Sequence, residues 1–376
     1  MDDNELQRAL IEANIPGAAY MIVDRDGARF EGAWGTADAG KSTPMRIDTP
    51  CQIASMTKVL VSASAMQLVE RGQLELDAPI AGVLSELAQP NVLDGFDDGG
   101  APVLRPAKRD ITLRHLLTHT AGFGYFFVHT EVLRYFSHVG MPKPGAKSGI
   151  EMALMFDPGE RWEYGVATDW VGQAIEAATG QKLRDYMREN LFDPLGMADT
   201  AFLDQPHPNA AAVHRRLPES GFATTPAFLG GGEFDAGGAG LTSTAPDYAR
   251  FMRAILRGGD LDGRRILETG TVAEMGRNQI GELRAGHLPT VMPQLANPFD
   301  MLPDQHTGWG LGFLINPERG PDGRSPGSLS WSGLFNSYFW IDPAAGVAGV
   351  FMAQLSPFGD AGALSAFGAL ERMAYA

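Results

Sequence analysis

The spacing of hydrophobic and polar positions predicts a mixture of helices and short strands. The first amphipathic segment, residues 5–14, predicts a helix. Two β-rich runs follow over 18–23 and 28–34, and the turn between them, 24–27, carries the Asp-Gly pair typical of hairpins. A long apolar segment then spans residues 51–72 and predicts a buried helix that ends near its final glycine.

The middle of the chain predicts mostly helices joined by long loops. Thr112 is placed to cap a helix that Gly122 would stop, and a second compact helix is expected over 169–180. The stretch 95–110 is rich in proline and glycine and therefore predicts a surface loop.

The pattern changes again toward the C-terminus. A capped amphipathic helix is expected over 244–259, and the chain closes on another helix over 362–376. Between them, aromatic and β-branched runs separated by turn residues predict four strands, over 308–316, 328–333, 337–343 and 346–354.

Together these elements predict an α+β fold. A two-stranded hairpin is too small a sheet to be stable alone, so we expect the N-terminal hairpin to join the C-terminal strands in one antiparallel sheet. The terminal helices would flank this sheet. The chain would then form an α/β domain from residues 1–76 and 236–376, with a helical domain, residues 77–235, inserted between the two parts.

The composition of the chain says more about its possible partners than about its fold. The chain has 376 residues, of which 44% are hydrophobic, so it can bury a large core. Its net charge of −15 argues against a nucleic acid or an anionic membrane surface as partner. No apolar stretch reaches the ~20 residues of a membrane span, and no signal peptide is visible, so we expect a cytoplasmic protein. The single cysteine, Cys51, excludes a disulfide within the chain.

The apolar helix begins with the tetrad "SMTK", which holds Ser55 and Lys58. Residues three apart on a helix share a face, so the hydroxyl and the amine should meet. A serine hydroxyl becomes a good nucleophile only when a neighbouring group removes its proton. The apolar residues after Lys58 are expected to bury its amine and lower its pKa, which would make it a base near neutral pH. A helix-capping serine with a solvent-directed lysine is the alternative for this spacing alone.

Five segments together carry a resemblance to a known family: "IASMTKVL", "LLTHTAGF", "PGERWEYGVATDWVG", "LFDPLGMADTAF" and "GGAGLTSTAPDYARFM". In this order they resemble the serine β-lactamase and penicillin-binding-protein superfamily, and within it the class C-like branch that includes the family VIII carboxylesterases. The resemblance extends from about residue 15 to the C-terminus and implies a β-lactamase/transpeptidase-like fold.

The resemblance also implies catalytic roles. Ser55 would be the nucleophile, with Lys58 as its lysine partner, and Tyr164 would join them from a loop of the helical domain. A phenol beside an amine can act as a base toward the serine or return a proton to the leaving group. Which of Tyr164 and Lys58 takes the first proton stays open, because the two should titrate as a coupled pair.

Two departures from the family pattern favour neutral esters over β-lactams. Relatives that hydrolyse β-lactams usually carry asparagine two residues after the tyrosine, where this chain has Val166. The third family motif is usually Lys-Thr-Gly, and the best match here is Trp331, Ser332 and Gly333. Both changes remove polar partners of a charged substrate, so the site is expected to be more apolar.

The resemblance further implies an oxyanion hole from the backbone N–H groups of Ser55 and Leu334. Aromatic residues near the motifs would suit an apolar substrate pocket, and core packing is the alternative for each of them. The expected substrate-binding residues are Trp331, Ser332, Gly333, Phe123, Tyr125 and Trp309, with Phe126, Phe127 and Phe335 as further candidates.

Three other patterns are set aside. Ser325 lies in "GRSPG", but its proline-rich surroundings predict a turn rather than the strand-to-helix elbow of an α/β-hydrolase. His115 and His119 lack the glutamate of a zinc protease. The glycine-rich stretch 230–240 lacks the Gly-Lys-Ser/Thr of a nucleotide loop. No metal or cofactor is expected.

The sequence therefore predicts a serine carboxylesterase that cleaves small esters through an acyl-enzyme on Ser55, with acyl transfer to another acceptor as a variant. A β-lactamase or a D-amino-acid peptidase is one alternative. A catalytically silent scaffold is the other. The expected partner is a small-molecule ester, and the sequence does not indicate an oligomeric state.

Overall fold

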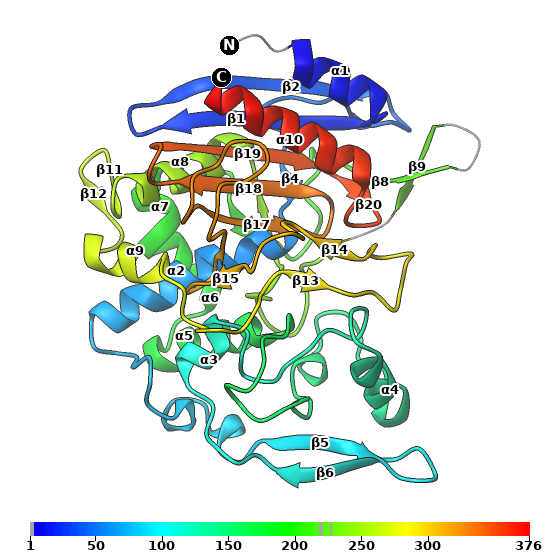
Figure 1. The fold of residues 1–376 in the computed structure, drawn as a ribbon, viewed down its shortest axis with the longest axis vertical. Coiled ribbons are helices and arrows are strands. Elements are labelled where there is room, and N and C mark those ends of the chain that lie inside the picture. The colour runs from blue at the N-terminus through cyan, green and yellow to red at the C-terminus, as the bar shows by residue number, and fades with distance from the viewer. Residues whose placement is uncertain (1–3, 218–220, 226–227) are drawn as a thin grey trace.

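The computed structural model describes residues 4–217, 221–225 and 228–376, and its centre is an antiparallel sheet of eight strands (Figure 1). The strand order is β15–β16–β17–β18–β19–β1–β2–β3, so the N-terminal hairpin joins the C-terminal strands, as the hydrophobic pattern predicts. The strands are β1 (Gly17–Asp24), β2 (Ala28–Asp38), β3 (Thr43–Pro44), β15 (Gly308–Trp309), β16 (Leu314–Ile315), β17 (Leu329–Gly333), β18 (Ser337–Asp342) and β19 (Val347–Ala353).

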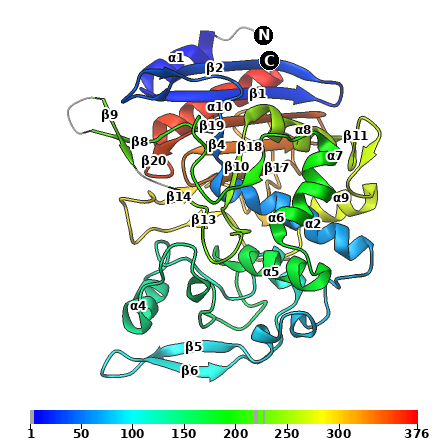
Figure 2. The same cartoon turned by 180° about the vertical axis from the view of Figure 1, so that it is seen from behind.

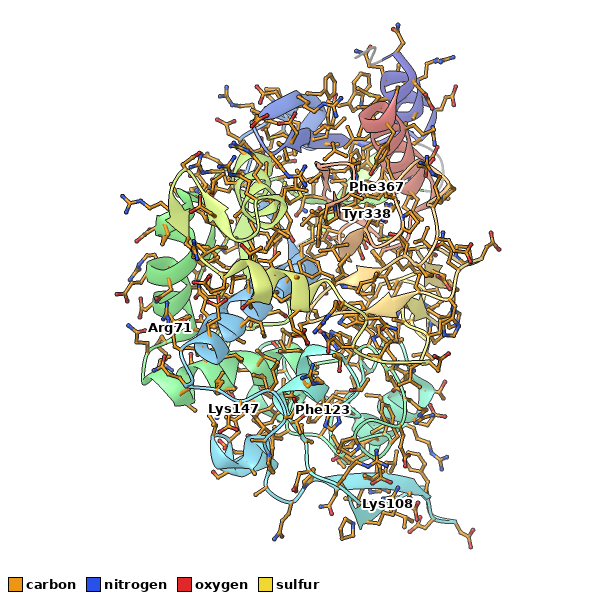
Figure 3. The ribbon with its side chains drawn as sticks, turned by 60° about the vertical axis from the view of Figure 1, so that its left-hand side comes forward. Arg71, Lys108, Phe123, Lys147, Tyr338 and Phe367 are labelled. Atoms are coloured by element: carbon orange, nitrogen blue, oxygen red, sulfur yellow. The ribbon has the colours of Figure 1, made fainter. Side chains whose placement is uncertain are left out.

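Helices cover both faces of this sheet, which explains why β18 and β19 are buried along their whole length. One face carries α1 (Asn4–Glu12) and α10 (Ala361–Tyr375), and the other carries α8 (Ala245–Leu256), as Figures 1 and 2 show from opposite sides. Tyr338 of β18 packs on Phe367 of α10 with ring centroids 5.1 Å apart (Figure 3). The α+β fold predicted from the sequence is confirmed.

The helix α2 (Thr57–Glu70) runs between the sheet and the middle segment of the chain. All of its residues from Thr57 to Leu68 are buried, because it packs against α5 (Ala167–Thr179) as well as the sheet domain. Gly180 ends α5 with a φ of +72°, as its position predicts. The other helices are α3 (Leu113–Leu117), α4 (Thr130–Val139), α6 (Leu183–Met187), α7 (Asp193–Leu195) and α9 (Thr269–Met275), with a π-helical segment at Arg188–Phe192 and 3₁₀ turns at Ala54–Met56, Ile80–Gly82, Ser85–Leu87 and Lys147–Gly149.

Short strands form smaller sheets around this frame. A three-stranded sheet contains β4 (Cys51–Gln52), β10 (Leu241–Ser243) and β7 (Ala201–Phe202). A second one contains β20 (Leu355–Ser356), β8 (Val213–Arg216) and β9 (Phe222–Thr225). Three pairs complete the set: β5 (Asn91–Phe96) with β6 (Pro102–Pro106), β11 (Asp260–Leu261) with β12 (Arg264–Arg265), and β13 (His287–Leu288) with β14 (Phe299–Asp300).

Three local predictions are wrong. Part of the expected loop 95–110 belongs to the β5–β6 hairpin, which β5 anchors by donating the Leu93 N–H to Leu154. The helix capped by Thr112 ends at Leu117 rather than near residue 122, because His119 already adopts a left-handed φ of +56°.

The predicted strand over 308–316 is split into β15 and β16 by a glycine turn. Gly312 adopts a φ of +103°, and a Cβ on Gly310 would lie 2.0 Å from the Met275 carbonyl oxygen. The turn therefore needs glycine at both positions.

The two-domain division stays a prediction. Residues 77–235 contain strands β5 to β9 as well as helices α3 to α7, so this segment is less helical than expected. Within the described residues, no helix combines the length and apolar character needed to cross a membrane.

Candidate active site

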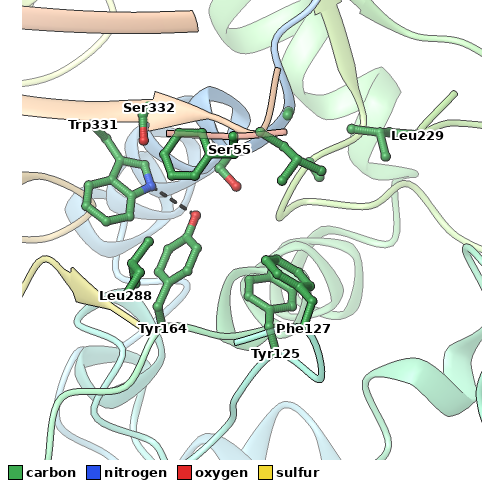
Figure 4. Close-up of a pocket in the computed structure, with 12 residues that line it drawn as sticks. Ser55, Tyr125, Phe127, Tyr164, Leu229, Leu288, Trp331 and Ser332 are labelled. Carbon is green, nitrogen blue, oxygen red and sulfur yellow. Dashed lines mark hydrogen bonds between the residues drawn. The ribbon is translucent and has the colours of Figure 1, made fainter. Parts of the chain in front are cut away.

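Ser55 lies in a 3₁₀ turn that immediately precedes α2, rather than at the first residue of the helix. Ala54 adopts a φ of +45°, a left-handed conformation that residues with a Cβ rarely occupy. The turn is held by the Met56 N–H, which donates to the Ile53 carbonyl at 3.0 Å. This tight local geometry directs the Ser55 side chain into a cavity (Figure 4).

The cavity has a volume of about 170 Å³ and an almost entirely apolar lining. Segments from distant parts of the sequence contribute to it: Ala54, Ser55, Tyr125, Phe127, Tyr164, Leu229, Ala239, Leu288, Trp331, Ser332, Leu334 and Phe358. A larger apolar cavity of about 290 Å³ adjoins it and shares Tyr125, Phe127, Leu229 and Ala239 as walls.

Lys58 is buried at the edge of this cavity, with its side chain directed at Ser55. Its Nζ lies 3.2 Å from the Ser55 hydroxyl, 3.0 Å from the Tyr125 hydroxyl and 2.6 Å from the Gly238 carbonyl oxygen. An ammonium group has three N–H donors, so three oxygens at these distances match its capacity.

The lowered pKa predicted for Lys58 is wrong. Burial favours the neutral amine, but the oxygens of Tyr125 and Tyr164 and the carboxylate of Asp169 outweigh it, so the pKa of Lys58 lies above its ordinary value. Burial alone, which is what the apolar sequence around Lys58 indicates, predicts the opposite direction. In this environment Lys58 is an ammonium ion at neutral pH.

Tyr164 reaches the same cavity from the loop before α5. Its ring centroid lies 4.8 Å from the Lys58 Nζ, and its hydroxyl accepts a hydrogen bond of 2.9 Å from the Trp331 Nε1–H. Figure 4 shows this hydroxyl directed into the cavity, on the side where Ser55 and Trp331 lie. The structure thus brings Ser55, Lys58 and Tyr164 together from separate parts of the chain.

Tyr125 has a more central place than the sequence indicated. It was expected only as a pocket residue, yet it is the phenol that hydrogen-bonds directly to Lys58. Burial raises the pKa of Tyr125, so its hydroxyl keeps its proton at neutral pH. Its position shortly after the "LLTHTAGF" segment was the one available signal, and that signal does not distinguish a wall residue from a lysine partner.

The end of β17 lies against the Ser55 turn. A Cβ on Gly333 would lie 2.3 Å from the Ile53 carbonyl oxygen, so only glycine allows this approach. Leu334, the next residue, lines the same cavity as Ser55. This placement is compatible with an oxyanion hole formed by their backbone N–H groups, and that role stays a prediction.

Three of the expected substrate-binding residues do not line the cavity. Gly333 packs against the Ser55 turn, and Phe123 packs against Trp170 with ring centroids 6.3 Å apart. Trp309 donates its indole N–H to the Leu117 carbonyl and packs edge-on against Trp331 at 4.7 Å. Trp309 and Gly333 therefore back the cavity wall and Phe123 belongs to the core, whereas Trp331, Ser332 and Tyr125 line the cavity.

The patterns set aside above have structural roles. Ser325 lies in the turn between β16 and β17, where its N–H donates to Asp342 at 2.7 Å. His115 caps α3 together with Thr112, and His119 packs under the Tyr164 ring at 4.9 Å. Within the described residues, no group of three or more histidine, cysteine or acidic side chains could hold a metal ion.

Two contributors to the site escaped the sequence analysis. The glycine-rich stretch 230–240 supplies the Gly238 carbonyl that accepts from Lys58. Asp169, at the start of α5, accepts a hydrogen bond of 2.9 Å from the Gly238 N–H. A backbone carbonyl carries no residue-type signal, so Gly238 could not be found from the sequence alone.

Comparison with known proteins places this arrangement in a family. The family model described as Beta-lactamase matches residues 3–371. The chain belongs to the Beta-lactamase family. The serine β-lactamase and penicillin-binding-protein superfamily expected from the sequence is therefore confirmed.

Within the Beta-lactamase family, the chain is similar to a fungal acyltransferase and a fungal esterase. It is 33% identical to the monacolin J acid methylbutanoyltransferase of Aspergillus terreus (strain NIH 2624 / FGSC A1156), over 95% of this chain and 91% of that protein. It is 31% identical to the lovastatin esterase of Penicillium rubens (strain ATCC 28089 / DSM 1075 / NRRL 1951 / Wisconsin 54-1255), over 94% and 92%. The unliganded simvastatin synthase structure from Aspergillus terreus superposes with a TM-score of 0.86 at 30% identity, covering 99% of this chain and 96% of that one.

Proposed function

We propose that this protein is a serine acyltransferase and esterase that forms an acyl-enzyme on Ser55. The observation that carries this proposal is the contact between the Ser55 hydroxyl and the Lys58 Nζ, 3.2 Å apart, at the wall of an apolar cavity. Full-length similarity to a methylbutanoyltransferase and to a lovastatin esterase supports the same chemistry.

The proposed reaction has two halves. The Ser55 oxygen attacks the carbonyl carbon of an ester, the alcohol leaves, and the serine proton is passed to the leaving oxygen. Water or an acceptor alcohol then attacks the acyl-enzyme, releasing an acid or a new ester and restoring the serine hydroxyl. Tyr164 is the proposed carrier of the proton in both halves, because it lines the same cavity as Ser55 and its hydroxyl can both donate and accept a hydrogen bond.

The cavity favours a short apolar acyl group. Its volume of about 170 Å³ is close to that of cavities which hold roughly a benzene-sized molecule. The adjoining cavity of about 290 Å³ would accommodate a bulkier apolar alcohol. Trp331 occupies the position of the usual family lysine, so the lining offers no cation to a β-lactam carboxylate at that point.

The test compares p-nitrophenyl butyrate with p-nitrophenyl dodecanoate and nitrocefin, with and without added butanol as acceptor. Wild type should turn over the short ester fastest and form butyl butyrate, and Ser55→Ala should lose this activity. Ser64→Ala is the matched control, since Ser64 lies on α2 and donates to the Leu60 carbonyl away from the cavity. Preferred turnover of nitrocefin would favour a β-lactamase, and an unlabelled Ser55 after fluorophosphonate treatment would contradict the proposal.

A further inference from the structure

Asp169 is a buried carboxylate that the proposed chemistry does not yet use. It lies in the first turn of α5 with 6% of its surface exposed. Its Oδ1 accepts from the Gly238 N–H at 2.9 Å. Burial raises the pKa of this carboxyl, and the charge of Lys58 and the Gly238 N–H oppose that rise. A buried carboxylate is costly unless it is paired, so this one needs a structural or chemical reason.

Gly238 links Asp169 to Lys58. Its N–H is held by the carboxylate, and its carbonyl oxygen accepts from the Lys58 Nζ at 2.6 Å. A Cβ on Gly238 would lie 2.5 Å from the Asp169 Oδ2, so the glycine is required for this close approach. Asp169 therefore fixes the position of the carbonyl that orients the lysine.

The buried charge of Lys58 also needs a partner of opposite charge. The groups that face Lys58 are Ser55 from its own turn, the phenols of Tyr125 and Tyr164 from two loops, Asp169 from α5 and the neutral His119 beneath them. Of these, Asp169 is the carboxylate. Its negative charge offsets the cost of burying the Lys58 ammonium.

We propose that Asp169 is a positioning residue that, through Gly238, holds Lys58 beside Ser55 as a permanent ammonium ion. This inference rests on the proposed function of Ser55. Lys58 then stabilises negative charge on the serine oxygen and does not accept its proton. The lysine acts as a fixed cation rather than as the general base.

A direct measurement does not depend on activity. The chain has six lysines, so NMR of protein labelled with ¹³C at the lysine ε-carbon gives few signals, and a Lys58→Arg variant assigns the relevant one. In wild type the Lys58 signal should show no titration below about pH 10, since its charge is held by Asp169. A midpoint for Lys58 between pH 6 and pH 8 in wild type would overturn the inference.

A substitution at Asp169 can remove its negative charge while keeping the size of the side chain. Asp169→Asn keeps an oxygen for the Gly238 N–H but removes the charge, so the Lys58 midpoint should fall by at least about one pH unit. The kcat for p-nitrophenyl butyrate should fall about tenfold with little change in KM, and the alkaline limb of its pH profile should move to lower pH.

Asp247→Asn is the matched control for this variant. Asp247 is equally buried and accepts a backbone N–H from Asp199 at 2.8 Å, but it lies on α8 and does not border the cavity. Its variant should keep the wild-type profile. An Asp169→Asn profile that coincides with wild type, or an equal shift in Asp247→Asn, would overturn the inference while Ser55 labelling still supported the proposed function.

Discussion

Single residues decide the chemistry that this cavity offers. Trp331 replaces a cation of the family pattern with an indole, and its N–H donates to Tyr164 instead of to a substrate carboxylate. Together with Leu229, Leu288 and Phe358, it makes the lining apolar. We therefore propose that this lining favours a neutral substrate.

Glu163, the residue before Tyr164, should make the free energy of unfolding of the protein depend on pH. Burial raises its pKa to about 7, and the neighbouring His129, whose pKa burial lowers to about 4, is uncharged at neutral pH and does not compensate. The folded state holds the Glu163 proton more tightly than the unfolded state. Its stabilising contribution is therefore complete below about pH 4.3 and is lost as the pH rises toward 7.

The measurement is the free energy of unfolding of wild type and Glu163→Gln between pH 5 and pH 8. Wild type should lose roughly 2 to 3 kcal/mol more than the variant, which cannot ionise at this position. Glu160→Gln, an exposed change in the same loop, should retain the wild-type dependence. Parallel curves for wild type and Glu163→Gln would contradict this prediction.

At the residue scale, groups that belong to a strong motif could be predicted from the sequence, and groups without one could not. The order of the family motifs predicts one site for Ser55, Lys58 and Tyr164, and the folded chain brings them together, while their catalytic roles stay predictions. The predicted direction of the Lys58 pKa was wrong. An apolar run in the sequence indicates burial, whereas Asp169 and Tyr125 come close to Lys58 only in the folded chain. Phe123 and Trp309 show the reverse error, since an aromatic residue near a motif serves the core as readily as a cavity.

Among the elements, the contact between β17 and the Ser55 turn should be sensitive to substitution at Gly333. Gly333→Ala would place a Cβ against the Ile53 carbonyl, and this backbone contact has little freedom to relax. We expect ester turnover to fall about 100-fold, because the Leu334 N–H would be displaced from the cavity. Gly270→Ala on α9, where the space is open, should leave turnover unchanged.

Steady-state kinetics with p-nitrophenyl butyrate and thermal unfolding of both variants test this prediction. A Gly333→Ala protein with normal kcat would show that Leu334 does not contribute to the transition state. Equal losses in both variants would indicate a general effect of the added methyl group.

Elements with clear periodicity were predicted well, and those that depend on tertiary contacts were not. The hairpin β1–β2, the buried helix α2 and the capped helix α8 follow from hydrophobic pattern and caps. The hairpin β5–β6 was missed because β6 contains two prolines and because β5 gains its support from Leu154, far along the chain. Such support has no local signal.

The whole molecule is expected to unfold as one unit. Trp331 of the sheet donates to Tyr164 of the middle segment, Lys58 donates to Tyr125, and the Gly238 N–H donates to Asp169, so polar contacts tie the two parts together at the site. Urea unfolding followed by far-UV circular dichroism and by tryptophan fluorescence should give coincident midpoints, and ester turnover should be lost over the same range. Two separate midpoints would instead support independent domains, divided near residues 76 and 236.

Composition bears on the whole molecule in a different way. The net charge of −15 still argues against a polyanionic partner, and a cytoplasmic location stays a prediction from the sequence. Neither property is decided by the fold.

The helices α1 and α10 pack side by side at the end of the molecule opposite the β5–β6 hairpin (Figure 1), and neither contributes to the cavity wall. A linker fused to either helix would therefore leave from a surface remote from Ser55. Immobilisation on a resin, or display on a carrier protein, could then use this end of the molecule without blocking the entry of substrate.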